Sequence, residues 1–206
     1  MKKIALITGA AGGIGQSITH KLAETLDGLI LVDIDVSRLK NLYHTLDHQL
    51  PKLYLECDLA NEKNIQHAIA NIQEHFEIPN ILINNAGYGG PFVKLDKLTS
   101  KDWQRILNIN LTSIFYLSKF LLPHMQQQGF GRIINIASMQ GLFGGIGSCA
   151  YVAAKHGVIG LSKTIAAEWG EFGINCNAIC PGYVDSPMGP ERKTRPKLLK
   201  KFHLNA

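Results

Sequence analysis

The stretch Lys3–Gly15, KIALITGAAGGIG, decides the fold of this chain. Its first part, Lys3–Ile7, is a short apolar run typical of a buried strand, and a helix-like segment, Gly13–Thr25, follows the glycines. Glycines let the chain turn tightly, so that backbone N–H groups can approach a pyrophosphate at the start of the helix. The glycine-rich turn alone is weak evidence, but a strand before it and a helix after it favour a dinucleotide-binding unit.

Short apolar runs alternate with longer amphipathic segments along the rest of the chain. We expect strands at Lys3–Ile7, Gly28–Val32, Leu53–Cys57, Ile81–Ile83, Gly131–Ala137 and Asn175–Ile179, and helices at Gly13–Thr25, Val36–Gln49, Glu62–His75, Lys101–Gln127 and Ala150–Phe172. This order predicts a single α/β domain with a doubly wound parallel sheet between two helical layers. The loops after the strands then line one edge of the sheet, where ligands bind in such folds.

The composition is that of one globular, soluble domain, since 46% of the 206 residues are hydrophobic and 18% are charged. No apolar run approaches the ~20 residues of a membrane span, and the run Ile4–Ile7 is too short for a signal peptide. We therefore expect a cytoplasmic protein that binds no membrane. The cysteines, which are Cys57, Cys149, Cys176 and Cys180, lack the paired spacing of a zinc site, so we expect buried free thiols and no metal.

The net charge of +5 comes from the end of the chain. Residues 187–206 hold one acid, Glu191, and the basic residues Arg192, Lys193, Arg195, Lys197, Lys200 and Lys201. The rest of the chain is therefore neutral, which argues against a nucleic-acid-binding protein. A lysine-faced amphipathic helix over a substrate explains this basic tail more simply than an anionic membrane or a nucleic acid.

Acidic and amide side chains follow three of the expected strands. Asp33 lies eighteen residues past Gly15, where a carboxylate can bind the ribose hydroxyls of an adenosine and repel a 2′-phosphate. No lysine or arginine in the glycine loop or directly after Asp33 would attract that phosphate, so we expect NAD rather than NADP. The alternative for Asp33 is a helix N-cap or a loop acid. Asp58 either contacts an adenine amino group or caps the next helix. Asn84 and Asn85 either cross-link the loops or satisfy backbone groups at the strand end.

Tyr151 and Lys155 stand four residues apart in a helix-like segment, so both side chains leave the same face. A free phenol titrates near pKa ~10, and a nearby ammonium lowers that pKa, which suits a proton donor and acceptor near neutral pH. Ser138, after the expected strand, can hold a carbonyl oxygen while the phenol protonates it. Such a Tyr–Lys pair is common by chance, so the argument depends on its surroundings.

The set of motifs resembles that of the classical short-chain dehydrogenases/reductases. The matching stretches cover about residues 3–188 and are TGAAGGIG from Thr8, VDID from Val32, DLA from Asp58, NNAG from Asn84, NINL from Asn108, INIAS ending at Ser138, YVAAK from Tyr151 and NAICPGYVDSPM from Asn177. Each motif is weak alone, but the set occurs in the order and spacing of the family. The resemblance implies a Rossmann-type fold and an NAD(H)-dependent oxidoreductase that interconverts a secondary alcohol and a ketone.

The resemblance also assigns residues to two sites. The catalytic set is Asn110, Ser138, Tyr151 and Lys155, and the cofactor-binding set is Gly9, Gly13, Ile14, Gly15, Asp33, Asp58, Leu59, Asn85, Ala86, Gly87, Tyr151, Lys155, Pro181, Gly182, Val184 and Ser186, the last replacing the usual threonine. By this likeness Tyr151 exchanges the proton, Ser138 polarises the substrate oxygen, and Lys155 lowers the pKa of the phenol and binds the nicotinamide ribose. Asn110 would hold a water that links Lys155 to solvent.

The substrate implied is a small-molecule alcohol or ketone. The stretches CAYVAAKHGVIGLSK and INCNAICPGYVDSPM look like those of 3-hydroxybutyrate dehydrogenases, which suggests a small 3-hydroxy acid; 3-oxoacyl-[acyl-carrier-protein] reductase-like activity is the alternative. Gln140 and the loop Gly144–Gly147 either border the substrate or only connect two elements. Family members pair through the helices at 101–127 and 150–172, so a homodimer is implied, whereas a tetramer is in doubt.

The chain departs from the family after residue 186. Family members continue with a further helix and a last strand, so we expect an NAD-binding catalytic domain over residues 1–186 and a basic substrate-lid segment, 187–206, that is cut short. The strand at Asn175–Ile179 would then be an exposed edge. A dinucleotide-binding protein without turnover is therefore a second alternative function.

Overall fold

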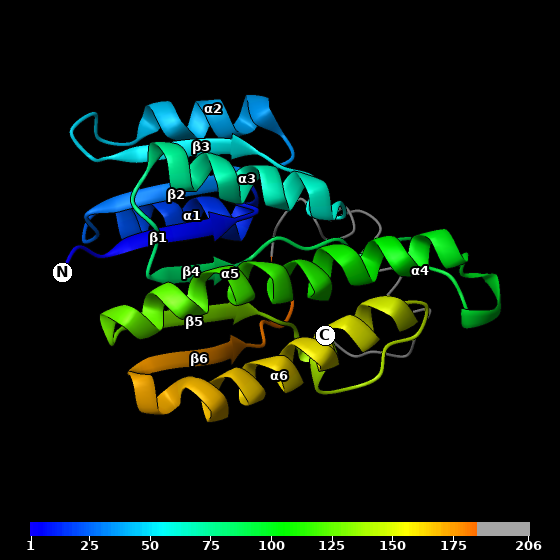
Figure 1. Cartoon of the computed structure of the whole chain (residues 1–206). Coiled ribbons are helices and arrows are strands. Elements are labelled where there is room, and N and C mark those ends of the chain that lie inside the picture. The colour runs from blue at the N-terminus through cyan, green and yellow to red at the C-terminus, as the bar shows by residue number, and fades with distance from the viewer. Residues whose placement is uncertain (185–206) are drawn as a thin grey trace.

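The structure is a computed structural model that describes residues 1–184 (Figure 1). Two predictions, the cofactor contact at Ser186 and the substrate-lid segment 187–206, lie outside the described residues.

Six parallel strands form one sheet in the order β3-β2-β1-β4-β5-β6. Their bounds are β1 Ile4–Thr8, β2 Gly28–Asp33, β3 Lys52–Glu56, β4 Ile81–Asn84, β5 Gly131–Ile136 and β6 Ile174–Ile179. Each lies within one residue of the predicted strand at both ends. This agreement arises because the apolar runs between turn residues are the buried strands themselves, as in β1, where all five residues are buried.

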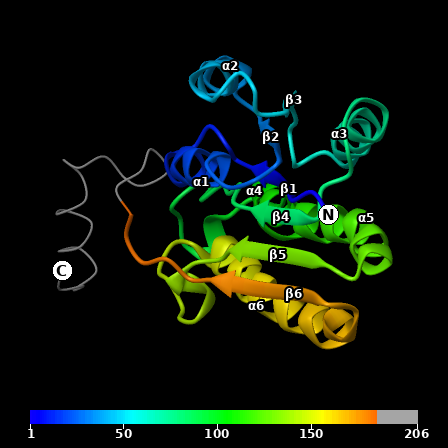
Figure 2. The same cartoon turned by 90° about the vertical axis from the view of Figure 1, so that its left-hand side faces the viewer.

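The sheet lies between two layers of helices, which confirms the predicted doubly wound α/β fold (Figures 1 and 2). Successive residues of a strand point to opposite faces, so β1 contributes to two cores. Ile4 and Leu6 pack in the core that includes residues of α3, α5 and α6, whereas Ala5 and Ile7 pack in the core that includes residues of α1 and α2. Both faces of the sheet are thus covered.

The helices are α1 Gly13–Ala23, α2 Val36–Thr45, α3 Glu62–His75, α4 Ser100–Leu107, α5 Ser113–Gln128 and α6 Cys149–Trp169. Short 3₁₀ turns are η1 Leu95–Lys97, η3 Met139–Gly141 and η4 Gly170–Phe172, and η2, Asn108–Thr112, is a π-helical turn. The prediction that helix α2 extends to Gln49 is wrong, because Leu46 leaves the helix in an extended conformation and is buried.

The predicted single helix at Lys101–Gln127 is interrupted by the π-helical turn η2. The side chain of Asn110 is buried inside it and donates from Nδ2 to the Ile106 carbonyl at 2.9 Å. In an uninterrupted α-helix that carbonyl accepts from the backbone N–H of residue 110, so the amide side chain competes with the regular ladder. Such π-helical turns are frequent at functional sites.

Within the described residues, one helical segment, Ser100–Gln128, is long and apolar enough by composition to cross a membrane. The sequence predicts no such segment, because polar residues interrupt its apolar runs. Core helices of globular proteins meet the same criterion, and here Leu117, Leu121 and Met125 pack in the core beside the sheet. Packing against the sheet accounts for the apolar composition of this segment.

The strand order reverses between β1 and β4. From β1, the strands β2 and β3 extend the sheet on one side. The chain then crosses to the other side of β1, where β4, β5 and β6 extend the sheet. Crossovers on the two sides leave a crevice where the order changes, at the carboxyl ends of the strands. The loops after β1 and β4 meet there.

Candidate active site

The glycine-rich loop joins β1 to α1 and packs tightly against the loop after β4. Gly9 has a positive φ of 62°, and a Cβ on it would lie 2.8 Å from the Ala86 Cα atom. A Cβ on Gly15 would lie 2.0 Å from the Gly9 carbonyl oxygen, so the first turn of α1 rests directly on the loop. Only glycine fits at these two positions.

The N-terminus of α1 is open to an anionic ligand. Its cap residue is Gly12, which offers no side-chain hydrogen bond, and the first turn contains no acid. The first backbone N–H groups of a helix lack intrahelical acceptors, and the helix dipole gives this end a partial positive charge. Gly13, Ile14 and Gly15 form this first turn, and its donors suit the oxygens of a pyrophosphate.

Asp33 at the end of β2 holds the glycine loop. Its Oδ2 accepts from the Ala11 N–H at 2.9 Å, and its Oδ1 accepts from the Asp35 N–H at 3.1 Å. The cap of α2 is Asp35, which accepts from the Arg38 N–H at 3.0 Å, so the helix-cap alternative for Asp33 is wrong. Each oxygen of Asp33 keeps acceptor capacity for a ribose hydroxyl.

Asp58 does not cap the next helix, and its predicted contact with an adenine amino group stays a prediction. Its Oδ1 accepts from the Ala60 N–H at 3.0 Å, and its Oδ2 accepts from Arg105 at 3.2 Å. The cap of α3 is Asn61, so Asp58 does not cap that helix. The adjacent Leu59 is buried, and the sequence analysis did not single out Arg105.

Asn85 cross-links the loops after β1 and β4, which confirms one of its two interpretations. Its Nδ2 donates to the carbonyls of Thr8 at 3.1 Å and Gly9 at 2.9 Å. In return, the hydroxyl of Thr8 accepts from the backbone N–H groups of Asn85 and Ala86, each at 3.1 Å. Gly87 follows at the same edge of the sheet, so this segment has a fixed position beside the glycine loop.

Asn84 begins a buried chain of polar side chains that ties α6 to the sheet. Its Nδ2 donates to Asn135 Oδ1 at 2.7 Å, and Asn135 Nδ2 donates to the hydroxyl of Ser162 at 2.8 Å. Ser162 in turn donates to the Val158 carbonyl at 2.7 Å. The sequence analysis left the role of Asn84 open between two alternatives and did not identify its partners. The chain of hydrogen bonds fixes the helix that carries Tyr151.

Ser138, Tyr151 and Lys155 lie together at the end of β5 and the start of α6. The phenol of Tyr151 is hydrogen-bonded with the hydroxyl of Ser138, and the Lys155 ammonium lies 5.4 Å from the centroid of the Tyr151 ring. Lys155 is 3% exposed, and its Nζ donates to the Ile136 carbonyl at 2.7 Å. The structure thus brings together three of the four residues of the predicted catalytic set.

The pKa values of this pair shift in the directions that burial dictates. Burial raises the pKa of the Tyr151 phenol, and the hydrogen bond with Ser138 opposes that rise. Burial lowers the pKa of Lys155 to about 8, and nearby Cys180 opposes that fall. The predicted lowering of the phenol pKa by Lys155 is therefore not seen, since desolvation of the phenolate outweighs the other contributions.

Asn110, the fourth residue of that set, fixes the loop that follows Gly87. Its Oδ1 accepts from the Tyr88 N–H at 3.2 Å, and its Nδ2 donates to the Tyr88 carbonyl at 2.8 Å as well as to Ile106. Both amide protons are thus used, while Oδ1 keeps one lone pair. The predicted role of Asn110 in holding a water stays a prediction.

The segment after β6 runs past Ser138. Pro181 accepts at its carbonyl from the Met139 N–H at 2.9 Å, and a Cβ on Gly182 would lie 4.0 Å from the Met139 sulfur. Val184 is exposed at the end of the described residues. Pro181 and Gly182 thus lie beside Met139, next to Ser138, and their predicted contact with the nicotinamide carboxamide stays a prediction.

Comparison with known proteins matches residues 3–197 to the model of the short chain dehydrogenases. The D-beta-hydroxybutyrate dehydrogenase of Rhizobium meliloti is 37% identical over 91% of this chain and 74% of its own length. The 3beta-hydroxysteroid dehydrogenase of Mediterraneibacter gnavus is 33% identical over 91% of this chain and 68% of its own length.

A solved structure of 4-hydroxyisoleucine dehydrogenase complexed with NADH superimposes with a TM-score of 0.87 at 30% identity, covering 97% of this chain and 81% of that one. Sequence and fold therefore agree: the chain belongs to the short-chain dehydrogenase family, the oxidoreductases that act on a CH–OH group.

Proposed function

We propose that this protein interconverts a secondary alcohol and a ketone with NAD(H). The observation that carries the proposal is the meeting of a hydroxyl, a phenol and a buried ammonium, from Ser138, Tyr151 and Lys155, beside an open helix N-terminus. These groups suit proton transfer to or from one oxygen atom next to a bound dinucleotide.

The residues at the edge of the sheet fit a dinucleotide. The first turn of α1 offers N–H donors to the pyrophosphate, and Asp33 offers acceptors to the adenosine ribose while its charge disfavours a 2′-phosphate. Asp58 and Leu59 would lie against the adenine, and Asn85, Ala86 and Gly87 behind the nicotinamide ribose. When bound, the dinucleotide supplies or accepts the hydride. The similar 4-hydroxyisoleucine dehydrogenase binds NADH, which supports NAD as a cofactor.

Proton transfer is assigned to Tyr151. Its raised pKa keeps the phenol protonated near neutral pH, so it can donate to the oxygen of a ketone that accepts hydride. In the oxidative direction the phenolate takes the proton from the alcohol, and the Lys155 ammonium stabilises that anion. Ser138 holds the substrate oxygen.

Lys155 and Asn110 orient the site. One N–H of Lys155 is committed to the Ile136 carbonyl, which leaves two protons for the hydroxyls of the nicotinamide ribose. Asn110 holds the loop at Tyr88 and would pass protons to solvent through a water on its remaining acceptor. Pro181, Gly182, Val184 and Ser186 are proposed to hold the nicotinamide carboxamide.

The substrate candidates come from the proteins to which this chain is similar. A small 3-hydroxy acid follows from similarity to D-beta-hydroxybutyrate dehydrogenase, whereas the name of the similar 3beta-hydroxysteroid dehydrogenase points to a large apolar alcohol. Activity on 3-oxoacyl thioesters and dinucleotide binding without turnover are the other candidates. We also propose a cytoplasmic homodimer through the helical regions 101–127 and 150–172.

The test is absorbance at 340 nm with NAD or NADH and a panel of hydroxyacids, polyols, secondary alcohols and 3-oxoacyl thioesters. Turnover of at least one class is expected, together with a loss of at least about a hundredfold in Tyr151→Phe, which removes the proton but keeps the ring. Tyr151→Phe should melt at nearly the temperature of the wild type and still bind NADH. Full turnover in Tyr151→Phe, or cofactor binding with no turnover of any class, would contradict the proposal.

A further inference from the structure

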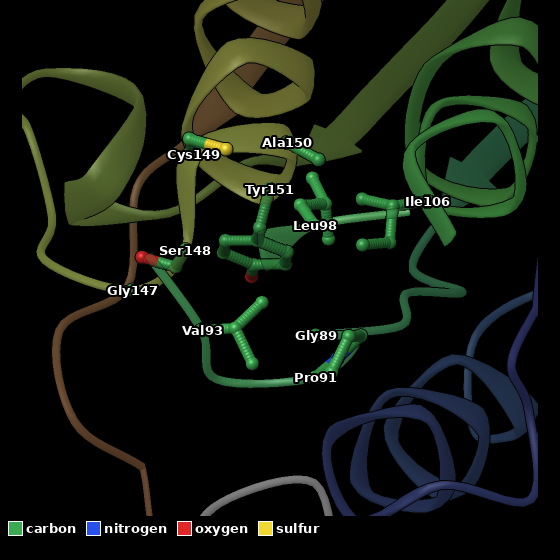
Figure 3. A pocket seen from close by; sticks show the side chains of 10 residues that line it. All are labelled: Gly89, Pro91, Val93, Leu98, Ile106, Gly147, Ser148, Cys149, Ala150 and Tyr151. Atoms are coloured by element: carbon green, nitrogen blue, oxygen red, sulfur yellow. The ribbon is translucent and has the colours of Figure 1, made fainter. Parts of the chain in front are cut away.

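A narrow crevice opens against the phenol of Tyr151 (Figure 3). Its lining comes from the loop after β4, from α4, and from the loop and first turn of α6. The lining residues are Gly89, Pro91, Val93, Leu98, Ile106, Gly147, Ser148, Cys149, Ala150 and Tyr151. None of them is charged, and their polar side-chain groups are two hydroxyls and a thiol.

Two loops close the outer end of this crevice. The Val93 N–H donates to the Gly147 carbonyl at 3.0 Å, and Gly147 has a positive φ of 73°. A Cβ on Gly147 would lie 3.0 Å from the ring of Phe92, so that ring covers the glycine. Of the residues predicted to border the substrate, Gly147 lines the crevice, while Gln140 accepts from the Ser148 hydroxyl at 3.3 Å and is not part of the lining.

Cations adjacent in sequence to the lining are engaged elsewhere or lie outside the crevice. Lys94 follows Val93 but is exposed and does not line the crevice. Arg105 precedes Ile106, but its guanidinium pairs with Asp58. The ammonium of Lys155 is buried behind Tyr151 and donates to a backbone carbonyl. Among residues 1–184, the lining thus offers no charge partner to an anionic substrate.

A carboxylate in this crevice would lose water without gaining a cation from residues 1–184, and that desolvation is costly. An apolar group would gain free energy at the same place, because it leaves water for an apolar wall. The crevice is closely packed and has no room for a water-sized group, so it is far smaller than the ~300 Å³ of a typical ligand site. A substrate would therefore lie along its mouth and over the rim.

The rim itself is apolar. Phe92 beside Val93 is 54% exposed, and Ile146 beside Gly147 is 61% exposed. Leu95, two residues past Val93, is 75% exposed. Large apolar side chains exposed together around a site commonly mark a surface that a ligand covers.

We propose that the preferred substrate is an uncharged, mainly apolar secondary alcohol or its ketone, and that a small 3-hydroxy acid is a poor substrate. The proposal rests on the proposed function, since it takes Tyr151 as the proton donor. The carbinol lies at the phenol, the smaller substituent lies against the mouth of the crevice, and the larger one lies over Phe92 and Ile146.

A matched pair of substrates tests the charge directly. Methyl 3-hydroxybutyrate and 3-hydroxybutyrate share the reacting carbinol and differ in one negative charge. We expect kcat/KM with NAD to be at least tenfold higher for the ester, and higher again for octan-2-ol than for butan-2-ol. Equal values for ester and acid, or a preference for the acid, would overturn the proposal.

Two variants of Val93 sharpen the test. Val93→Lys places an ammonium in the crevice, and Val93→Met adds a chain of similar length without charge. The ratio of kcat/KM for acid over ester should rise at least tenfold in Val93→Lys and stay within about threefold in Val93→Met. A similar ratio in both variants would show that charge in the crevice does not control the choice.

A binding measurement separates failure of this proposal from failure of the proposed function. Cys149 is half-buried and lines the crevice, so its rate of alkylation by iodoacetamide, followed by peptide mass spectrometry, reports occupancy. With NADH present, methyl acetoacetate should slow this rate and acetoacetate should not. If no substrate turns over, the proposed function fails, but selective protection by the ester still supports the apolar site; equal protection by both, or by neither, refutes it.

Discussion

The glycines of the α1 loop and those of the loops near Tyr151 differ in what surrounds them. Gly9 and Gly15 in the first loop have no room for a Cβ, which would lie 2.8 Å and 2.0 Å from backbone atoms. Near Tyr151, a Cβ on Gly89 or Gly144 meets nothing within 4 Å, whereas a Cβ on Gly147 would lie 3.0 Å from the side chain of Phe92. Backbone packing thus fixes the first loop, whereas the loops near Tyr151 combine open positions with positions that contact side chains.

The largest expected effect is on the cofactor side. Gly15→Ala drives a methyl group into the Gly9 carbonyl, and overpacking of this kind costs about 1–3 kcal/mol or more of unfolding free energy. We expect a lower melting temperature and no stabilisation by NADH. The matched control is Gly144→Ala, whose unfolding free energy should stay within about 0.5 kcal/mol of the wild type. Equal losses of unfolding free energy in Gly15→Ala and Gly144→Ala would contradict the difference in packing between the two loops.

Lys155 should make stability depend on pH. Its pKa in the folded protein, about 8, lies below the ordinary value of 10.5, so between these pH values the unfolded chain binds a proton that the folded chain does not. Stability therefore rises with pH across this window, by up to about 3 kcal/mol for the full shift. In a Tyr151→Phe background, the substitution Lys155→Met should therefore increase the free energy of unfolding most at pH 7 and least near pH 10.

Thermal melts at both pH values measure this difference. Lys163→Met, on the exposed side of the same helix, serves as the control. This substitution should change the melting temperature by the same amount at pH 7 and at pH 10. If the effect of Lys155→Met on the melting temperature does not change with pH, then burial does not shift the pKa of this lysine.

Thr8 tests the cross-link between the loops. Thr8→Val keeps the shape but leaves the Ala86 N–H without its acceptor and the Asn85 N–H with the Ile83 carbonyl alone, at a cost of about 2 kcal/mol. Thr8→Ser keeps the hydroxyl and should cost less than about 1 kcal/mol. Chemical denaturation measures both, and equal costs would contradict the assigned role of the hydroxyl.

The smallest expected effect concerns cofactor choice. Asp33→Ala should weaken NADH binding about tenfold, because it removes the charged acceptor of the ribose hydroxyls, and should narrow the preference over NADPH. Asp35→Ala removes the cap of α2 and costs about 1 kcal/mol of stability without changing that preference. Titration of protein fluorescence with both nucleotides would decide; an unchanged NADH-to-NADPH ratio in Asp33→Ala counts against the prediction.

Sequence reasoning predicted the features that depend on local pattern. The strands follow apolar runs between turn residues, and the glycine loop follows from its neighbours along the chain. It missed contacts that only the fold creates, such as the pairing of Arg105 with Asp58, 47 positions away. The raised pKa of Tyr151 was missed for the same reason, since burial depends on elements distant in sequence.

The strand order also bears on how such chains diversify. β1, β2 and β3 are complete before the chain crosses to β4, and within residues 1–184 the two halves of the sheet pair through β1 and β4 alone. A recombination event between β3 and β4 therefore exchanges the half with the glycine-rich loop and Asp33, or the half with Ser138, Tyr151 and Lys155, and has one strand junction to rematch. The loop after β4 must then still fit the glycine-rich loop, because Asn85 bonds to Thr8 and Gly9.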